Sequence, residues 1–359
     1  MTTAYIGLGS NLGDRKSFIN NALKMLAETK NIEVVRVSDL IETAPLGGAD
    51  QPKYLNAATR IKTALTAEDL HKVLLNIETS LGRSRKEKWS SRIVDLDLLL
   101  FGEEIINSPA LTIPHPQMHL RSFVLKGLCQ LDADLLHPVI RVPMKELANR
   151  LNGADFVING EQPQLVSVAG VIGVGKTTLA KNMSKIFSCK CIFEPYDKNP
   201  YLPGVYAGKK ELALDCQLFF LTGRVAQLNH NSLKAGEVLF ADYVFDKELI
   251  YAKHLLNAEQ LTLYHTIHKQ VISDIAVPVL VIYLTDSVED CLERIHRRNR
   301  PYEQKIQPQF LDSLSRGHDE LFADWKKCPV IRLSKSEFDY MRDDNIQHLA
   351  NQIRSYIAV

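Results

Sequence analysis

The chain has 359 residues, of which 45% are hydrophobic and 24% are charged, and its formal net charge is +1. These values are ordinary for globular proteins, and the length favours two domains, because domains usually run to about 100–200 residues. The balanced charge excludes a chain that binds nucleic acid through overall basicity, and no run approaches the roughly 20 apolar residues that span a membrane. The N-terminus lacks the basic flank and apolar core of a signal peptide, and the six cysteines are scattered, so we expect a cytoplasmic protein with reduced thiols.

The first half predicts strands and helices that alternate without a strict β-α-β rhythm, which indicates an α+β sandwich. The expected strands are Ala4–Leu8, Ile32–Ile41, Tyr54–Thr63 and Ile93–Phe101. The expected helices are Ser17–Thr29 and Thr66–Leu81, the second with Thr66 as its N-cap.

The pattern weakens over residues 151–164, which contain two Asn-Gly turn formers and a stiff Gln-Pro-Gln segment. We place the domain boundary here and expect domains at residues 1–158 and 164–359. Beyond it, apolar strands alternate with long helices, which is typical of a parallel α/β sheet. The expected strands are Leu165–Ala169, Lys190–Phe193, Val238–Ala241 and Val277–Leu284, and a helix is expected over Leu179–Phe187.

Two aspartates, Asp95 and Asp97, form the first candidate site. They stand two apart on an expected strand, so both carboxylates point to the same face. Like charges at that spacing repel unless a cation lies between them, and magnesium that bridges phosphate oxygens is one such cation. A surface ion-pair network with the basic residues of segment 83–92 is the alternative that these residues alone leave open.

Several dispersed motifs in the first 150 residues resemble, in order, those of 6-hydroxymethyl-7,8-dihydropterin pyrophosphokinases. They are Tyr5–Gly13, Thr43–Gly47, Gln51–Asn56, Gly82–Lys86, Lys88–Leu100, Ile113–His115 and Arg121–Phe123. The resemblance implies a ferredoxin-like α+β domain that transfers pyrophosphate from ATP to the pterin hydroxymethyl group, an enzyme of folate biosynthesis.

The resemblance also implies roles for individual residues. Asp95 and Asp97 would hold Mg²⁺. The basic residues that would clamp the ATP phosphates are Arg83, Arg92 and Arg121, and the residues expected near ATP are Thr112 and His115. The residues that would hold the pterin ring are Thr43, Leu46, Tyr54, Asn56 and Phe123.

The second half opens with a phosphate-binding motif. Residues 170–177 fit G-x-x-x-x-G-K-[ST] and stand between an apolar strand and a helical run, which is the context the motif needs. The expected phosphate cradle consists of Gly170, Gly173, Gly175, Lys176, Thr177 and Thr178. Lys176 would reach the outer phosphates of ATP, and Thr177 would ligate Mg²⁺.

Later motifs resemble those of the deoxyribonucleoside kinase family over about residues 165–333. They are Glu194-Pro195, Asn199–Leu202, Gln217–Leu221 with Arg224, and the basic segment Cys291–Glu303. The resemblance implies that Glu194 is the general base for a 5′-hydroxyl and that Gln217 pairs with the nucleobase. The lid arginines that would neutralise the transferring phosphate are Arg294, Arg298 and Arg300, and the other substrate contacts would be Tyr201, Arg224 and Asp242.

One departure from that family concerns the third strand of the second half. An acidic-Arg-Ser triplet is common there, but here Asp242 is followed by Tyr243 and no arginine stands nearby. The hypothesis is therefore a bifunctional kinase that uses ATP and Mg²⁺ on a pterin and on a deoxynucleoside, with a purine favoured by the Asp242-Tyr243 variant. The alternatives left open for the second half are another P-loop kinase acting on a monophosphate and a domain that binds nucleotide only to regulate. We expect no nucleic-acid or membrane partner, and the resemblance implies a homodimer through the C-terminal domain.

Overall fold

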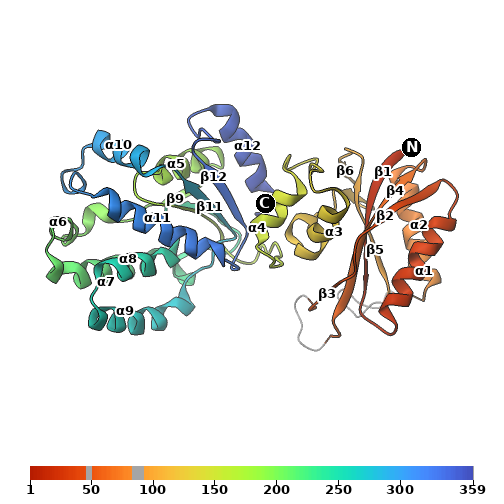
Figure 1. Ribbon diagram of the computed structural model, residues 1–359, viewed down its shortest axis with the longest axis horizontal. Helices are drawn as coiled ribbons and strands as arrows, with labels where there is room; N and C mark the ends of the chain where they lie inside the picture. Colours follow the sequence, from red (N-terminus) through yellow and green to blue (C-terminus); the bar gives the residue numbers. More distant parts are fainter. Residues whose placement is uncertain (46–50, 83–92, 359) are drawn as a thin grey trace. The chain divides into compact units, whose positions relative to one another are not determined.

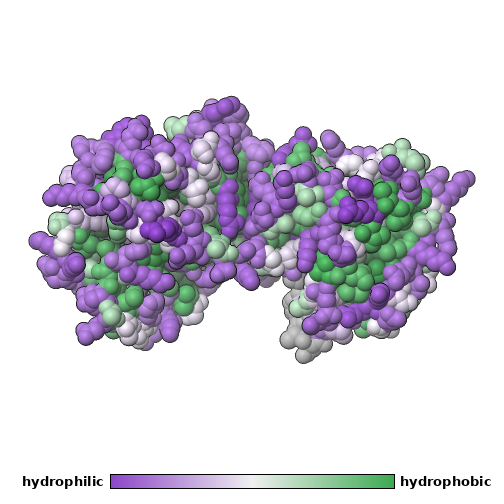
Figure 2. Space-filling view, viewed as in Figure 1, coloured by the Kyte–Doolittle hydropathy of each residue, from purple (hydrophilic) through white to green (hydrophobic). Residues whose placement is uncertain are grey.

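The computed structural model describes residues 1–45, 51–82 and 93–358. The chain forms two compact units, Met1–Val157 and a second that begins at Ile158 (Figure 1). Figure 2 shows hydrophilic side chains over most of the visible face of each unit, with smaller apolar areas between them. In the part of the chain that is described, no helix combines the length and apolar character needed to cross a membrane.

The N-terminal unit is built on an antiparallel sheet with the strand order β2-β4-β1-β5, in which β3 pairs with β4. Its strands are β1 (Thr2–Ser10), β2 (Ile32–Val37), β3 (Ile41–Thr43), β4 (Tyr54–Thr63), β5 (Asp95–Phe101), β6 (Ile106–Asn107) and β7 (Thr112–Ile113). Its helices are α1 (Arg15–Glu28), α2 (Ala67–Ser80), α3 (Ser122–Asp132) and α4 (Met144–Leu151).

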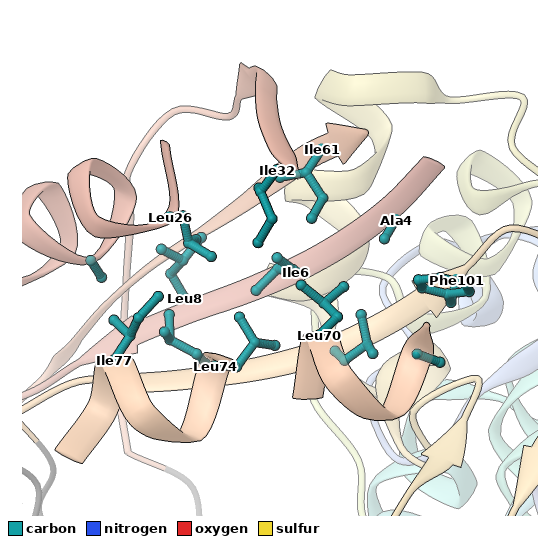
Figure 3. Close-up of a cluster of buried hydrophobic side chains, with 14 of the residues drawn as sticks. Ala4, Ile6, Leu8, Leu26, Ile32, Ile61, Leu70, Leu74, Ile77 and Phe101 are labelled. Carbon is teal, nitrogen blue, oxygen red and sulfur yellow. The ribbon is translucent and has the colours of Figure 1, made fainter. Parts of the chain in front are cut away.

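The sheet of this unit is covered on both faces. Alternate residues of β1 and β5 pack against α1 and α2, where Ile6, Leu70 and Leu74 are fully buried (Figure 3). Helices α3 and α4 cover the opposite face of the sheet (Figure 1). Leu99 of β5 and Leu125 of α3 belong to a second buried core on this face. The strand order, with helices connecting β1 to β2 and β4 to β5, makes the α+β architecture expected for this half.

The single strand expected over Ile32–Ile41 is wrong, because residues 38–40 leave the sheet between β2 and β3. The hydroxyl of Ser38 accepts the backbone N–H of Ala58 at 2.9 Å. The backbone N–H of Asp39 donates instead to Gln130 Oε1 on α3, at 2.8 Å. The backbone N–H of Ser38 still donates to the carbonyl oxygen of Ala58 at 2.9 Å, so side chains replace only part of the strand ladder at this bend.

The two expected helix starts have different outcomes. The helix expected from Ser17 begins at Arg15, because Asp14 accepts the backbone N–H of Ser17 at 3.0 Å and caps the helix. The expected N-cap at Thr66 is confirmed, since its hydroxyl accepts the backbone N–H of Asp69 at 3.2 Å.

The C-terminal unit contains a five-stranded parallel sheet with the order β12-β11-β8-β10-β9. Its strands are β8 (Gln164–Ala169), β9 (Lys190–Ile192), β10 (Val238–Ala241), β11 (Leu280–Thr285) and β12 (Val330–Ser334). Its helices are α5 (Lys176–Ile186), α6 (Leu202–Tyr206), α7 (Ala213–Leu228), α8 (Glu248–Leu255), α9 (Ala258–Val271), α10 (Val288–Arg298), α11 (Pro308–Ala323) and α12 (Asp343–Arg354). The parallel sheet predicted for this half is confirmed.

The strand order brings three functional segments to one edge of this sheet. Every residue of the central strand β8 is buried, and the phosphate-binding loop leads from its carboxyl end into α5. Strand β10 lies next to β8, and β9 lies on the far side of β10. Asp242 directly follows β10, and Glu194 is the second residue after β9. Ligands bind at the carboxyl ends of strands in open α/β sheets, so this edge is the candidate site.

Candidate active sites

A cavity of about 410 Å³ lies in the N-terminal unit, beside the ends of β1, β4 and β5. The predicted site residues that line it are Thr43, Tyr54, Asn56, Asp95, Asp97, His115, Arg121 and Phe123. These residues come from segments up to 80 positions apart, and the fold gathers them around one space. Of the other predicted residues, Thr112 lies on β7 outside the lining, and Leu46, Arg83 and Arg92 fall outside the described residues.

The two aspartates stand at the start of β5, opposite glycines of β1. Asp95 pairs with Gly9 and Asp97 with Gly7. Because the two glycines carry no side chain, nothing from β1 covers the surface beside the carboxylates. Both aspartates share the sheet face of Leu99, away from α1 and α2, and they open into the cavity.

Asn56 lies against the inner wall of the cavity with its amide fixed. Its Nδ2 donates to Thr43 Oγ1 at 2.9 Å, across the β3–β4 pair. A Cβ at Gly9 would lie 3.1 Å from Asn56 Oδ1, so the glycine gives the amide its room. An amide held in this way keeps one N–H donor and its acceptor oxygen for a flat heterocycle in the cavity.

Arg121 is placed by the start of α3. The backbone N–H and the hydroxyl of Ser122 donate to Asp155 Oδ1 at 2.5 and 2.8 Å and fix this helix end. Arg121 Nη2 donates to Gln117 Oε1 at 2.8 Å, while its buried Nη1 has no hydrogen-bond partner among the described residues. Burial lowers the pKa of Arg121, whereas the carboxylates of Asp155 and Asp97 oppose that shift. A half-buried guanidinium with a donor to spare suits an anion such as a phosphate.

Three residues at this site were missed by the sequence analysis. Gln51 and Gln117 also line the cavity. Glu78 on α2 is buried and accepts the backbone N–H of Leu96 at 2.8 Å, between the two aspartates. The sequence does indicate this residue, because Glu78 stands four positions after Leu74 and so lies on the apolar face of the expected helix. A carboxylate on such a face is expected to have a buried partner.

In the C-terminal unit, the phosphate-binding loop has the backbone that glycine permits. Gly173 has φ +85° and Gly175 has φ +106°. A Cβ at Gly173 would lie 2.5 Å from the carbonyl oxygen of Cys291, and a Cβ at Gly175 would meet the hydroxyl of Tyr340. The loop is thus closely packed from outside, and its conformation fits the phosphate cradle predicted from the sequence.

Lys176 and Thr177 begin α5 at the end of this loop. Lys176 Nζ donates to the carbonyl oxygen of Val171 at 2.9 Å, so the ammonium folds over the loop. Burial, followed by repulsion from Lys247, lowers the pKa of Lys176 to about 7. Both effects disfavour the charged form of Lys176. An anion beside the ammonium, such as a phosphate group, would offset them.

A chain of hydrogen bonds connects the phosphate end of the site to Glu194. Thr177 Oγ1 donates to Asp242 Oδ2 at 2.6 Å, and the backbone N–H of Glu194 donates to Asp242 Oδ1 at 2.9 Å. Thr177 and Glu194 also line a common cavity of about 670 Å³. The hydroxyl and carboxylate oxygens of Thr177 and Asp242 are of the kind that Mg²⁺ prefers.

The carboxylate of Glu194 is held by two cations. Oε1 pairs with Arg224, and Lys247 Nζ donates to Oε2 at 2.6 Å. Arg224 also pairs with Glu248, which is fully buried and accepts the hydroxyl of Tyr264 at 2.5 Å. Lys247 and Glu248 were missed by the sequence analysis, which gave Glu194 no partner.

The predicted base-contacting residues lie on and beside α7. Gln217 is buried on this helix, one position after Cys216. The neighbouring Cys216 belongs to an apolar cluster that includes Phe220, Tyr196 and Tyr201. This aromatic cluster beside a buried amide has the composition of a pocket for a flat ring.

The three lid arginines each make polar contacts within the unit, although Arg298 remains exposed and Arg300 lies just beyond α10. Arg294 Nε donates to the carbonyl oxygen of Gly173 at 2.7 Å, and its guanidinium pairs with Asp286. Arg298 Nε donates to Glu303 Oε2 at 2.6 Å. Arg300 pairs with the same glutamate at 3.3 Å and stacks on the ring of Tyr196, 3.9 Å from its centroid.

The architecture of the second unit, a parallel sheet with a phosphate-binding loop between its central strand and the next helix, defines the class of P-loop nucleotide-binding proteins. Family comparisons then identify both units. The model of the 7,8-dihydro-6-hydroxymethylpterin-pyrophosphokinase family matches residues 5–133, and the deoxynucleoside kinase model matches residues 166–358. The chain therefore belongs to both families, with a pterin pyrophosphokinase domain followed by a deoxynucleoside kinase-like domain.

Curated relatives match the first of these domains. The 2-amino-4-hydroxy-6-hydroxymethyldihydropteridine pyrophosphokinase of Haemophilus influenzae is 44% identical over 138 residues, which are 38% of this chain and 86% of that protein. The enzyme of the same name from Bacillus subtilis is 43% identical over 128 residues, which are 36% of this chain and 77% of that protein. The folic acid synthesis protein of Pneumocystis carinii is 44% identical over 135 residues, 38% of this chain but only 18% of its own length.

Solved structures of deoxyadenosine kinase from M. mycoides are similar to the chain over 53% of its length and 99% of theirs. The form with bound dATP is 23% identical with a TM-score of 0.47, and the form with bound dCTP is 22% identical with the same TM-score.

Proposed function

We propose that the protein is a bifunctional kinase whose two activities belong to residues 1–158 and 164–359. The first transfers pyrophosphate from ATP to 6-hydroxymethyl-7,8-dihydropterin, and the second transfers the γ-phosphate of ATP to the 5′-hydroxyl of a deoxynucleoside. Magnesium, held by Asp95 and Asp97 in the first unit and by Thr177 in the second, would neutralise phosphate charge during both transfers.

The pterin activity is supported by the lining of the cavity of about 410 Å³. The rings of Tyr54 and Phe123 would pack on the pterin, and the amide of Asn56 would pair with its polar edge. Arg121, with an Nη1 that lacks a partner among the described residues, would bind a phosphate oxygen. The hydroxymethyl oxygen then bonds to the β-phosphorus of ATP, the bond from that phosphorus to the α-phosphate oxygen breaks, and AMP leaves. The strand order β2-β4-β1-β5 supports a ferredoxin-like fold for this unit.

The deoxynucleoside kinase activity is supported by one observation above all, the connection from Thr177 through Asp242 to Glu194. It places a carboxylate a short distance from the phosphate-binding loop, where a hydroxyl that attacks the γ-phosphate needs a base. Glu194 would take the proton of the 5′-hydroxyl as the oxygen–phosphorus bond forms and ADP leaves. Arg294, Arg298 and Arg300 would move from their carboxylate partners to the phosphate oxygens.

We further propose a purine deoxynucleoside as substrate and a homodimer formed through the C-terminal unit. The buried amide of Gln217 supports recognition of a base, because it offers both donors and an acceptor. The choice of purine and the homodimer rest on the sequence resemblance. Analytical ultracentrifugation of the full chain and of residues 1–158 tests the second point, since only the full chain should sediment as a dimer.

The test of the second activity is ATP turnover by the full chain with Mg²⁺ and each of the four common deoxynucleosides. Product is detected as the 5′-monophosphate by mass spectrometry. The test variant is Glu194→Gln, and the matched control is Glu237→Gln, because Glu237 is exposed. We expect turnover of deoxyadenosine or deoxyguanosine that Glu194→Gln lowers at least about 100-fold and Glu237→Gln leaves unchanged. Turnover only of deoxynucleoside monophosphates, or of none of these compounds, would contradict the proposal.

A further inference from the structure

The side chain of Lys247 has a place in the second site that neither the motifs nor the comparisons assign. Lys247 ends the short 3₁₀ turn Phe245–Lys247, five residues after Asp242, and it is buried. Its ammonium lies 2.6 Å from Glu194 Oε2. The position just after Asp242, where the resemblance leads one to expect an arginine, is instead the buried Tyr243.

The two cations on Glu194, Arg224 and Lys247, differ in how many of their N–H donors are used within the described residues. Arg224 is fixed from three sides, because it pairs with Glu194 and Glu248 and stacks on Phe220 at 4.9 Å. Lys247 donates one hydrogen bond, to Glu194, and no other within the described part of the chain. Its ammonium also lies over the rings of Tyr243 and Tyr251, at 5.8 and 5.5 Å from their centroids, and these contacts use no N–H donor in a hydrogen bond to oxygen or nitrogen. An ammonium carries three N–H donors on a flexible stem, so two donors of Lys247 remain available beside the carboxylate.

The charge around Lys247 favours an anion at this place. Lys247 donates to Glu194, which is joined through Asp242 to Thr177, and Lys176 is the residue before Thr177. The positive charges of Lys247 and Lys176 therefore belong to the same part of the site and repel each other. Burial, then the guanidinium of Arg224, lowers the pKa of Lys247, while Asp242 and Glu248 oppose that shift. A phosphate group between the two lysines would relieve this repulsion and favour the charged form of both.

We propose that Lys247 is a catalytic residue of the deoxynucleoside kinase reaction. Its ammonium binds the transferring γ-phosphoryl group and remains hydrogen-bonded to Glu194. The inference rests on the proposed activity of this unit. As the 5′-oxygen bonds to the γ-phosphorus and the bond to the β-phosphate oxygen breaks, the hydroxyl proton passes to Glu194 and the electron pair leaves with ADP. Lys247 stays protonated throughout and compensates the charge that develops on the equatorial phosphate oxygens.

The first test compares Lys247→Met and Lys247→Arg with the wild-type chain in steady-state kinetics. We expect Lys247→Met to lower kcat by about 100- to 1,000-fold, as for loss of one preorganised donor to a developing charge, with the KM for the deoxynucleoside changed less than about fivefold. Lys247→Arg keeps the charge and should retain kcat within about tenfold of wild type. The matched control is Lys253→Met, an exposed lysine on α8, which should leave kcat unchanged.

The second test separates contact with phosphate from support of Glu194. In a double-mutant cycle, Lys247→Met is added to Glu194→Gln, and both are assayed by single turnover with radiolabelled ATP. If Lys247 binds the phosphoryl group, the double variant should be at least about tenfold slower than Glu194→Gln alone. Equal rates would overturn the proposal, because Lys247 would then act only by positioning the base.

Two controls keep the outcomes distinct. The fluorescence of Trp325, which is buried in this unit, reports whether each variant is folded. Should Lys247→Met fail to fold, Lys247→Gln retains a donor without the charge and takes its place, with the same expected loss of kcat. An unchanged kcat in a folded variant refutes the role of Lys247 alone, whereas absence of wild-type turnover refutes the proposed activity itself.

Discussion

Gly173 in the phosphate-binding loop offers a sharp test of how the second site is held together. Its φ of +85° is a conformation that costs an L-residue about 1–2 kcal/mol. In Gly173→Ala the new Cβ would also lie 2.5 Å from the carbonyl oxygen of Cys291 on α10, so backbone must shift. Such overpacking costs about 1–3 kcal/mol. The sum predicts a loss of about 2–5 kcal/mol in the free energy of unfolding of the C-terminal unit.

Gly208→Ala is the matched control for this prediction. Gly208 has a similar φ of +91°, but a Cβ there meets no atom within 4 Å. The control therefore carries the conformational cost without the collision. Both variants restrict the unfolded chain equally, so their difference, about 1–3 kcal/mol, isolates the contact between the loop and α10.

The assay uses urea unfolding followed by tryptophan fluorescence. The chain has two tryptophans, and Trp89→Phe leaves Trp325, which is buried in the C-terminal unit, as the sole reporter. The slope with urea should be equal in the variants, so that the midpoints report stability. We also expect the KM for ATP in the second activity to rise in Gly173→Ala, because the shifted backbone no longer presents its N–H groups to phosphate. Free energies of unfolding for Gly173→Ala and Gly208→Ala that agree within about 0.5 kcal/mol would refute the reasoning.

Three further predictions follow from contacts in the two units. Phe123→Ala should raise the KM for the pterin about tenfold or more while the KM for ATP changes little, since a ring-stacking contact worth about 0.5–1.5 kcal/mol beyond its buried area is lost; equal rises in both would contradict the placement of this ring. Burial lowers the pKa of His137 to about 3 from 6.5, so the unfolded chain binds a proton that the folded chain does not. The stability of the N-terminal unit should therefore fall as pH drops below about 6.5, by about 2 kcal/mol at pH 5. His137→Asn, which keeps an acceptor for the local backbone N–H groups, should remove this dependence in urea titrations, and an unchanged slope would show that other groups cause it. Tyr264→Phe removes a donor to the buried carboxylate of Glu248 and should cost about 1.5–3 kcal/mol in the free energy of unfolding, followed by Trp325 fluorescence; a cost near zero would contradict the importance of this hydrogen bond.

The sequence predicts best the parts of both sites that depend on local pattern. The P-loop of residues 170–177 is contiguous, and the alternation along β5 places Asp95 and Asp97 on one face; the structure has both features. The strand expected over Ile32–Ile41 fails because its interruption depends on Gln130, which is 91 positions from Asp39. No local pattern carries that contact.

The partners of Glu194 were out of reach of the sequence for the same physical reason. Lys247 and Arg224 approach this carboxylate from 53 and 30 positions away, and no local pattern links either residue to Glu194. Only the parallel order of β8, β10 and β9 brings these segments together. What the sequence does signal is a charge inside an apolar pattern, as Glu248 beside Leu249 and Ile250 illustrates, and such a charge is expected to have a buried partner.

The most direct test of the central claim, two independent kinase sites in one chain, is a crosswise assay of both activities in the same preparations. Wild type, Asp97→Asn and Glu194→Gln are each assayed for AMP release with 6-hydroxymethyl-7,8-dihydropterin and for 5′-phosphorylation of the preferred deoxynucleoside. We predict that Asp97→Asn loses only the pterin activity, by about 100-fold or more, and that Glu194→Gln loses only the deoxynucleoside activity to a similar extent. Loss of both activities in either variant, or of neither, would contradict the assignment of one reaction to each unit.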